Sequence, residues 1–241
     1  MRIELTRSFP QADSFDRDSY ESIGTQNEKM LHKMIKYYLC PDTACHEFKI
    51  GSYIADIYQN GHITEIQTGS FRSMKSKLEK LLPNYKISIV YPVIRRKTII
   101  EVDAYTGSKK PKKSPRIGSP LKIMRELYQI TKYLNHPNIE IIIFLTDVDE
   151  YRMNSVDSSK LEKINQFPKG TPVLYQLKTK KDYVDLLPEN LPPEWTLKTF
   201  KNYTKLSISD NQCLVQVYKQ LDIIVNTRKE GKAFVYKIKG D

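Results

Sequence analysis

Cysteine is scarce in this chain, and its three residues, Cys40, Cys45 and Cys213, cannot make a disulfide framework. We therefore expect a reducing, cytoplasmic environment. Cys40, Cys45 and His46 offer three zinc ligands, but their spacing is unfavourable and no fourth ligand lies nearby in the sequence. A zinc site is not predicted.

Other common signals are absent too. No run is apolar enough to span a bilayer, and the acidic N-terminal region does not resemble a signal peptide, so we expect no membrane insertion. A glycine-rich phosphate loop is missing, which argues against a nucleotide cofactor. His32, His62 and His136 are scattered and form no Ser/His/Asp pattern.

Positive charge is what the sequence has in excess. Its 241 residues include 39 Lys and Arg against 28 Asp and Glu, a formal net charge of +11. Such an excess favours a polyanionic partner, either nucleic acid or an anionic membrane surface. The length suits one sizeable core plus a small additional module.

The strongest local pattern is a hairpin around Asn60 and Gly61. Asn-Gly between two runs rich in Ile, Tyr and Thr is typical of a two-residue turn whose residues both have positive φ. With this turn at the tip, Ile57 lies opposite Thr64. One step further from the tip, Asp56 lies opposite Glu65.

Two carboxylates so placed repel each other unless a cation lies between them. Gln67 falls on the same face as Glu65, because side chains alternate along a strand. Two acids and a further polar ligand suit Mg²⁺ or Mn²⁺. The alternative is an exposed acidic pair on a solvated sheet face.

The remaining pattern predicts a mixed α/β core over residues 21–188, after a flexible segment at 1–20. Residues 150–180 are left unassigned, because Pro168, Gly170 and Pro172 should break a long element. The expected elements are a helix at 26–39, the hairpin at 47–68, a helix at 71–82, β segments at 86–93 and 97–103 that could pair, a basic loop at 108–120, a helix at 121–134 and a buried strand at 139–147.

Residues 189–241 are predicted to form a winged helix-turn-helix domain. Helices at 197–203 and 209–221 precede two strands, 223–226 and 233–238, which flank a basic turn. Such a domain binds DNA, although a role in dimerisation or protein binding is an alternative. In this domain Ser209 is expected to cap the second helix.

The pattern Asp56…Glu65-x-Gln67 after an acid-bearing helix resembles the PD-(D/E)XK, or restriction-endonuclease-like, nuclease superfamily. More closely, the chain looks like an uncharacterised bacterial group that joins such a core to a C-terminal winged helix. Residues 113–118 are similar to a motif of that group. The resemblance implies a restriction-endonuclease-like mixed sheet flanked by helices, and Mg²⁺-dependent hydrolysis of phosphodiester bonds in DNA. A homodimer is compatible with it, because each such core cuts one strand.

By matching positions, the resemblance makes Glu28, Asp56 and Glu65 the metal ligands. Glu28 also fits a capping box with Thr25, and both roles can hold at once. Gln67 replaces the usual lysine, so it can orient water or phosphate but cannot act as a base. The missing charge could come from Lys75 or Lys77, although a solvated helix face is the simpler interpretation of these two. The predicted DNA-binding residues are Lys75, Lys77, Lys109, Lys110, Lys112, Lys113, Arg116, Asn211, Gln212, Arg228, Lys229 and Lys232.

Two other functions stay open. The loss of the lysine favours a catalytically inactive nuclease fold that binds DNA as a regulator. An RNA-directed nuclease fits the charge equally well, but it leaves the winged helix without a role.

Overall fold

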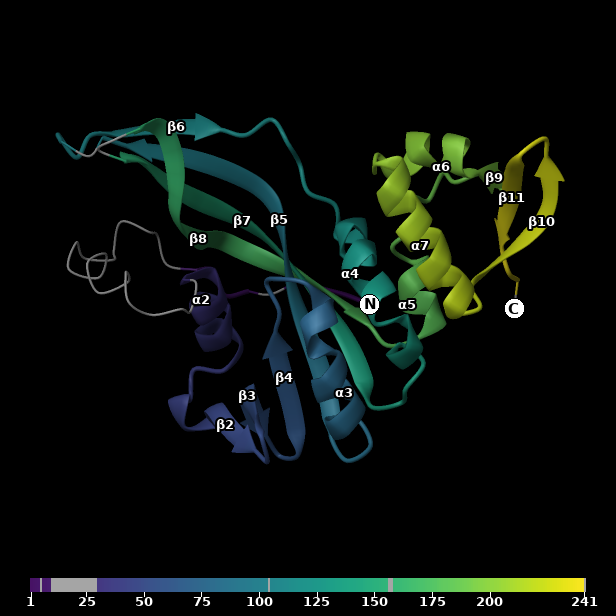
Figure 1. Ribbon diagram of the computed structural model, residues 1–241, viewed down its shortest axis with the longest axis horizontal. Coiled ribbons are helices and arrows are strands. Elements are labelled where there is room, and N and C mark those ends of the chain that lie inside the picture. Colours follow the sequence, from purple (N-terminus) through teal and green to yellow (C-terminus); the bar gives the residue numbers. More distant parts are fainter. Residues whose placement is uncertain (5, 10–29, 104, 156–157, 241) are drawn as a thin grey trace.

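The computed structural model describes residues 1–4, 6–9, 30–103, 105–155 and 158–240. Its architecture is mixed α/β: an eight-stranded mixed sheet with helices precedes a small three-stranded antiparallel sheet with helices of its own (Figure 1). The predicted α/β class is confirmed at this level. None of the described helices is long and apolar enough to cross a membrane.

The large sheet has the strand order β1-β8-β7-β5-β4-β3-β2, and β6 pairs with β5. Its β4–β5 and β5–β7 pairs are parallel and its other pairs are antiparallel. The small sheet has the order β10-β11-β9. The strands are β1 (Arg2–Glu4), β2 (His46–Ile50), β3 (Tyr53–Gln59), β4 (His62–Ile66), β5 (Lys86–Val102), β6 (Lys109–Lys113), β7 (Ile139–Ser155), β8 (Ser158–Leu177), β9 (Trp195–Thr196), β10 (Ile224–Glu230) and β11 (Ala233–Ile238).

The helices largely follow the predicted positions. The first one ends at Leu39 as predicted, whereas its expected start, with Thr25 and Glu28, lies outside the described residues. The helix predicted at 121–134 is wrong as a single element, because Ile130 leaves the helical region (φ −121°, ψ 21°). The helices are α2 (Met30–Leu39), η3 (Thr43–Cys45), η4 (Phe71–Met74), α3 (Lys75–Leu81), η5 (Pro120–Ile123), α4 (Met124–Gln129), η6 (Thr131–Tyr133), α5 (Lys180–Val184), α6 (Leu197–Thr204) and α7 (Ile208–Gln220), where η marks a 3-10 helix.

The hairpin at the Asn-Gly turn is confirmed. Asn60 and Gly61 have φ values of 50° and 78°, as a turn of this kind requires. Ile57 pairs with Thr64, and Gln59 pairs with His62. The edge strand β2 extends the hairpin on the other side of β3.

Residues 86–93 and 97–102 are β structure as predicted, but they are not two segments that pair with each other. They form one strand, β5, which runs parallel to β7 with a register shift between Ile94 and Lys97. Asp147 of β7 supports this irregular point, because its carboxylate accepts hydrogen bonds from the Arg95 guanidinium (2.8 and 2.9 Å) and from the Arg96 backbone N–H (3.1 Å). The charged Arg-Arg pair therefore interrupts the apolar pattern without ending the strand.

Two segments expected to be irregular are also strands. Residues 109–113 form β6 against the far end of β5, although the sequence predicts a loop there. Pro168 and Gly170 lie within the long strand β8, and Gly170 takes a φ of +67° beside a register shift between β7 and β8. Together β6 and the far ends of β5, β7 and β8 form a curved extension of the sheet (Figure 1).

Apolar residues bury both faces of the sheet. On β5, Ile87 and Ile89 join a cluster with α3 and α4, while Val90 joins a second cluster with α2. Because neighbouring residues of a strand point to opposite faces, α2 covers the face opposite α3 and α4.

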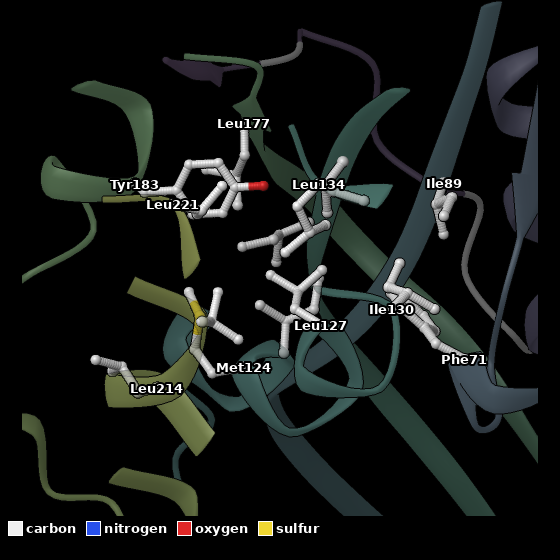
Figure 2. Close-up of a cluster of buried hydrophobic side chains, with 14 of the residues drawn as sticks. Phe71, Ile89, Met124, Leu127, Ile130, Leu134, Leu177, Tyr183, Leu214 and Leu221 are labelled. Atoms are coloured by element: carbon white, nitrogen blue, oxygen red, sulfur yellow. The ribbon is translucent and has the colours of Figure 1, made fainter. Parts of the chain in front are cut away.

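The C-terminal helices share the first of these clusters. Leu214 of α7 and Leu221, which follows that helix, are buried with Met124 and Leu127 of α4, and Leu177 and Tyr183 lie in the same cluster (Figure 2). Tyr218 also donates a hydrogen bond of 2.6 Å to the Tyr183 carbonyl. The buried core therefore continues past residue 189, where the sequence predicts a domain boundary.

Candidate functional site

Asp56 lies where β3 and β4 separate. The ladder pairs of these strands end at Ile57 and Thr64. One residue beyond, Asp56 Oδ2 accepts the Ile66 backbone N–H at 2.7 Å. The carboxylate thus takes the place of a backbone carbonyl, which explains why it is held firmly at the end of the ladder.

Glu65, on β4, is buried beside Asp56. Only 8% of its surface is exposed, and the charge of Asp56 acts on it directly. Its Oε1 atom is buried and has no hydrogen-bond partner among the described residues. Buried carboxylate oxygens normally have partners, so this atom marks an incomplete site.

Lys77 brings a positive charge from α3 to this pair. Its Nζ lies 2.6 Å from Glu65 Oε2 and donates a hydrogen bond of 2.5 Å to the Ile54 carbonyl. The side chain is 15% exposed. The simpler interpretation, in which Lys77 belongs to a solvated helix face, is therefore wrong. For Lys75 it is confirmed, because that side chain is exposed.

His32 is a site residue that the sequence analysis missed. Its Nε2 lies 3.2 Å from Asp56 Oδ2, although 24 residues separate the two in sequence. Its position on α2 gives no sign of this contact, because the contact depends on how α2 packs on the sheet.

The two acids have opposite pKa shifts. Burial raises the pKa of Glu65, the charge of Asp56 raises it further, and Lys77 opposes both, so that the pKa reaches about 7. Burial also acts to raise the pKa of Asp56, but the hydrogen bond and charge of His32 and the Ile66 N–H outweigh it and hold the pKa below its usual range. One acid therefore stays charged while its neighbour titrates near neutral pH.

Gln67 and Glu28 complete the predicted set. The amide nitrogen of Gln67 donates to the Ser70 carbonyl at 2.8 Å and to Ser73 Oγ at 2.9 Å, which ties it to the start of η4. Glu28 lies outside the described residues. Within the part of the chain that the structure covers, no three His, Cys, Asp or Glu side chains gather closely enough to hold a metal ion.

A cleft of about 560 Å³ lies between α2, β5 and β8. Its lining includes Leu31 and Thr68, the sequence neighbours of His32 and Gln67. Lys122 and Lys163 contribute positive charge to its wall. Asp56, Glu65 and Lys77 are not among the residues that line the cleft.

A Ser/His/acid contact occurs elsewhere in the sheet. Ser88 Oγ lies 2.8 Å from His62 Nε2 and donates to Glu140 Oε2 at 2.8 Å. In a catalytic triad the acid contacts the histidine, whereas here it contacts the serine, which is only 1% exposed. These hydrogen bonds join the neighbouring strands β4, β5 and β7, and they do not activate Ser88 as a nucleophile.

The predicted DNA-binding lysines of residues 109–113 are all exposed on β6. Arg116 is exposed in the segment that follows. In the same segment, Gly118 N–H donates to the Arg95 carbonyl at 2.8 Å, and a Cβ at Gly118 would lie 1.9 Å from the Ile94 carbonyl oxygen. The basic segment is thus anchored by a close backbone contact that only glycine permits.

Asn211 does not reach the surface of α7, so the predicted base contact by this residue is wrong. Its side chain is fully buried, accepts from Thr204 Oγ1 at 2.8 Å and donates to the Ser207 carbonyl at 3.1 Å. It therefore fixes the turn between α6 and α7. Gln212 is exposed, and Ser207 caps α7 in place of the predicted Ser209.

The remaining candidates lie on β10 and in the turn that follows it, because β10 runs to Glu230 and not, as predicted, only to Asn226. Arg228 pairs with Glu194 and, at 2.7 Å, with Glu230, so part of its charge is neutralised. Lys229 lies over the Phe234 ring at 4.8 Å, and Lys232 is exposed.

Fold and site define a mixed α/β protein with a buried Glu65 and a half-buried Asp56 where the strands of a β-hairpin separate. The chain belongs to the family described as "Domain of unknown function (DUF8091)", which matches residues 29–173. That range includes Asp56, Glu65 and β6, but not α6, α7 or the small sheet. Because the match assigns no activity, the resemblance to nucleases stays a prediction.

A protein of Treponema pallidum (strain Nichols), described as "Uncharacterized protein", is 32% identical over 123 residues. The match covers 51% of this chain, which spans about half (49%) of that relative's length. No solved structure matches the chain.

Proposed function

We propose that the protein is a metal-dependent DNA endonuclease with a restriction-endonuclease-like core and a C-terminal winged helix. The acids Asp56 and Glu65 carry this proposal, because the buried Glu65 Oε1 lacks a partner among the described residues, in a site where two acids repel. A hard divalent cation would relieve both problems at once.

The donor atoms present suit Mg²⁺ or Mn²⁺. Asp56 and Glu65 would hold the ion, with Glu28 as the further acid that the resemblance implies. When bound, such an ion lowers the pKa of a coordinated water and neutralises charge on the phosphate. His32 fixes the orientation of the Asp56 carboxylate. Lys77 offsets the negative charge of Glu65, and its ammonium would also contact a phosphate oxygen bound beside this acid.

The arrangement of the elements supports the proposed fold. A hairpin, β3–β4, carries both acids, β5 lies parallel to β4, and helices cover both faces of the sheet. At the C-terminal end, the order α5-β9-α6-α7-β10-β11 has β9 paired with β11, an order that suits a winged helix. Gln212, Lys229 and Lys232 would contact DNA there, and β6 would add phosphate contacts.

A second candidate is a DNA-binding protein on an inactive nuclease fold. Two observations favour it. The Gln67 amide is already hydrogen-bonded to Ser70 and Ser73, and the Lys77 ammonium already neutralises the charge of Glu65. In that case Lys77 and Glu65 serve as a structural ion pair, and the basic surfaces bind DNA without cutting it.

Plasmid cleavage separates these two functions. Purified protein should nick or linearise supercoiled plasmid with Mg²⁺ or Mn²⁺ and not with EDTA. Glu65→Gln and Asp56→Asn should abolish cleavage while DNA affinity stays within about twofold. Glu79→Gln is the matched control, because Glu79 is an exposed acid on α3. Tight DNA binding without cleavage under every metal condition would favour the inactive fold.

A further inference from the structure

Two cysteine side chains meet at the far end of β3 from the acidic pair. Cys40 directly follows α2, and Cys45 ends η3. The Gln59 amide nitrogen lies 3.4 Å from Cys40 Sγ and 3.3 Å from Cys45 Sγ. Both sulfur atoms therefore lie beside the same amide nitrogen.

The loop between them holds this arrangement in place. Asp42 caps η3, since its Oδ1 accepts the Ala44 N–H at 3.0 Å. Cys40 Sγ donates to the Asp42 carbonyl at 3.3 Å, and His46 Nε2 lies 2.8 Å from the Cys40 carbonyl. These hydrogen bonds thus hold the loop in a conformation that keeps the two thiols on the same side of it.

The two thiols differ in exposure. Cys40 is 3% exposed, whereas Cys45 is half-buried. Burial raises the pKa of the Cys40 thiol; its hydrogen bond to Asp42 opposes this, and the neighbouring Cys45 thiol adds to the rise. An oxidant from solution would therefore meet Cys45 first.

We propose that Cys40 and Cys45 form a reversible disulfide. With a peroxide as oxidant, the Cys45 thiol takes one oxygen atom to become a sulfenic acid, and the peroxide leaves as water or an alcohol. The Cys40 sulfur then attacks the Cys45 sulfur, a disulfide bond forms, and water leaves. With glutathione disulfide, Cys45 forms the mixed disulfide and Cys40 displaces glutathione, so that two thiols are oxidised as one external disulfide is reduced.

This link would join the end of α2 to the start of β2. β2 pairs with β3, so the disulfide would tie α2, which carries His32, to the strand pair that includes Asp56. The proposal does not depend on the proposed nuclease activity.

One peptide reports on the pair directly. Trypsin should release residues 37–49, which contain both cysteines and no internal Lys or Arg. Reduced full-length protein is treated with glutathione disulfide or hydrogen peroxide, alkylated with iodoacetamide, digested and analysed by mass spectrometry. Cys213 lies in another peptide and is the internal control.

We expect both alkyl groups to disappear from the peptide after oxidation, with a mass about 2 Da below the unlabelled reduced form. Dithiothreitol should restore both labels, and Cys213 should stay labelled throughout. In Cys40→Ser, Cys45 should instead keep a glutathione adduct, because the resolving thiol is absent. The proposal is overturned if the oxidised wild-type peptide keeps both labels, carries a lasting adduct on Cys45 alone, or is linked to Cys213 or to a second copy.

Discussion

The Lys77 ammonium lies 2.6 Å from Glu65 Oε2, in a site where Asp56 already supplies one negative charge. Two carboxylates and one ammonium leave a net charge of about −1 when both acids are ionised. A buried excess of this kind is costly, because the surrounding protein screens it poorly. The Lys77–Glu65 ion pair offsets part of this cost, and the remaining negative charge would favour a bound cation.

Replacing Lys77 by Met should destabilise the protein at pH 8 by about 2 kcal/mol, because Glu65 then keeps a buried charge without its partner. Chemical denaturation followed by circular dichroism measures this. Lys80→Met, at an exposed position of α3, should change stability by less than about 0.5 kcal/mol. Equal effects of the two substitutions would show that the Lys77–Glu65 contact contributes nothing.

The raised pKa of Glu65 predicts how stability depends on pH. Between its ordinary value of 4.5 and its value of about 7 in the folded protein, the folded state binds more protons than the unfolded state. The free energy of unfolding should therefore fall as pH rises through this window, by an amount on the order of 2 kcal/mol. In Glu65→Gln this contribution should vanish, and identical pH profiles for both proteins would refute it.

Gly118→Ala should destabilise the protein by about 2 kcal/mol or more, because the added Cβ would lie 1.9 Å from the Ile94 carbonyl oxygen. Gly69→Ala is the matched control, since a Cβ there meets nothing within 4 Å. Thermal unfolding measures both. A neutral Gly118→Ala would mean that residues 113–118 do not pack against β5 as described.

The four lysines of β6 should account for much of the salt dependence of DNA binding. Changing Lys109, Lys110, Lys112 and Lys113 to Gln should weaken binding and reduce the slope of log K against log salt by up to about 3 to 4, near 0.9 for each lost phosphate contact. Changing the same residues to Arg should preserve both. Fluorescence anisotropy at several salt concentrations measures the slope, and an unchanged slope in the Gln variant would exclude β6 from the interface.

Short-range signals in the sequence predicted the parts of the fold that depend on neighbouring residues. Asn60 and Gly61 fixed the hairpin, because few residue pairs accept positive φ at both positions. The two C-terminal helices and the last strand also lie within one residue of their predicted bounds, whereas β10 continues four residues beyond its predicted end at 226.

Long-range contacts decided the rest. The sequence cannot show that Asp147 stabilises the irregular point of β5 at Arg95, or that β6 finds a partner strand. His32 and Lys77 reach the acidic pair only because α2 and α3 pack on opposite faces of the sheet. Asn211 looked like a surface residue of α7, yet its amide satisfies the turn before that helix.

A crystal soaked in Mn²⁺ tests the central claim most directly, because manganese scatters anomalously and can be located without ambiguity. We expect an anomalous peak within coordination distance of both Asp56 and Glu65 in the wild type, and no peak in Glu65→Gln. Absence of manganese between these carboxylates at millimolar concentration, with Lys77 still paired to Glu65, would contradict the account.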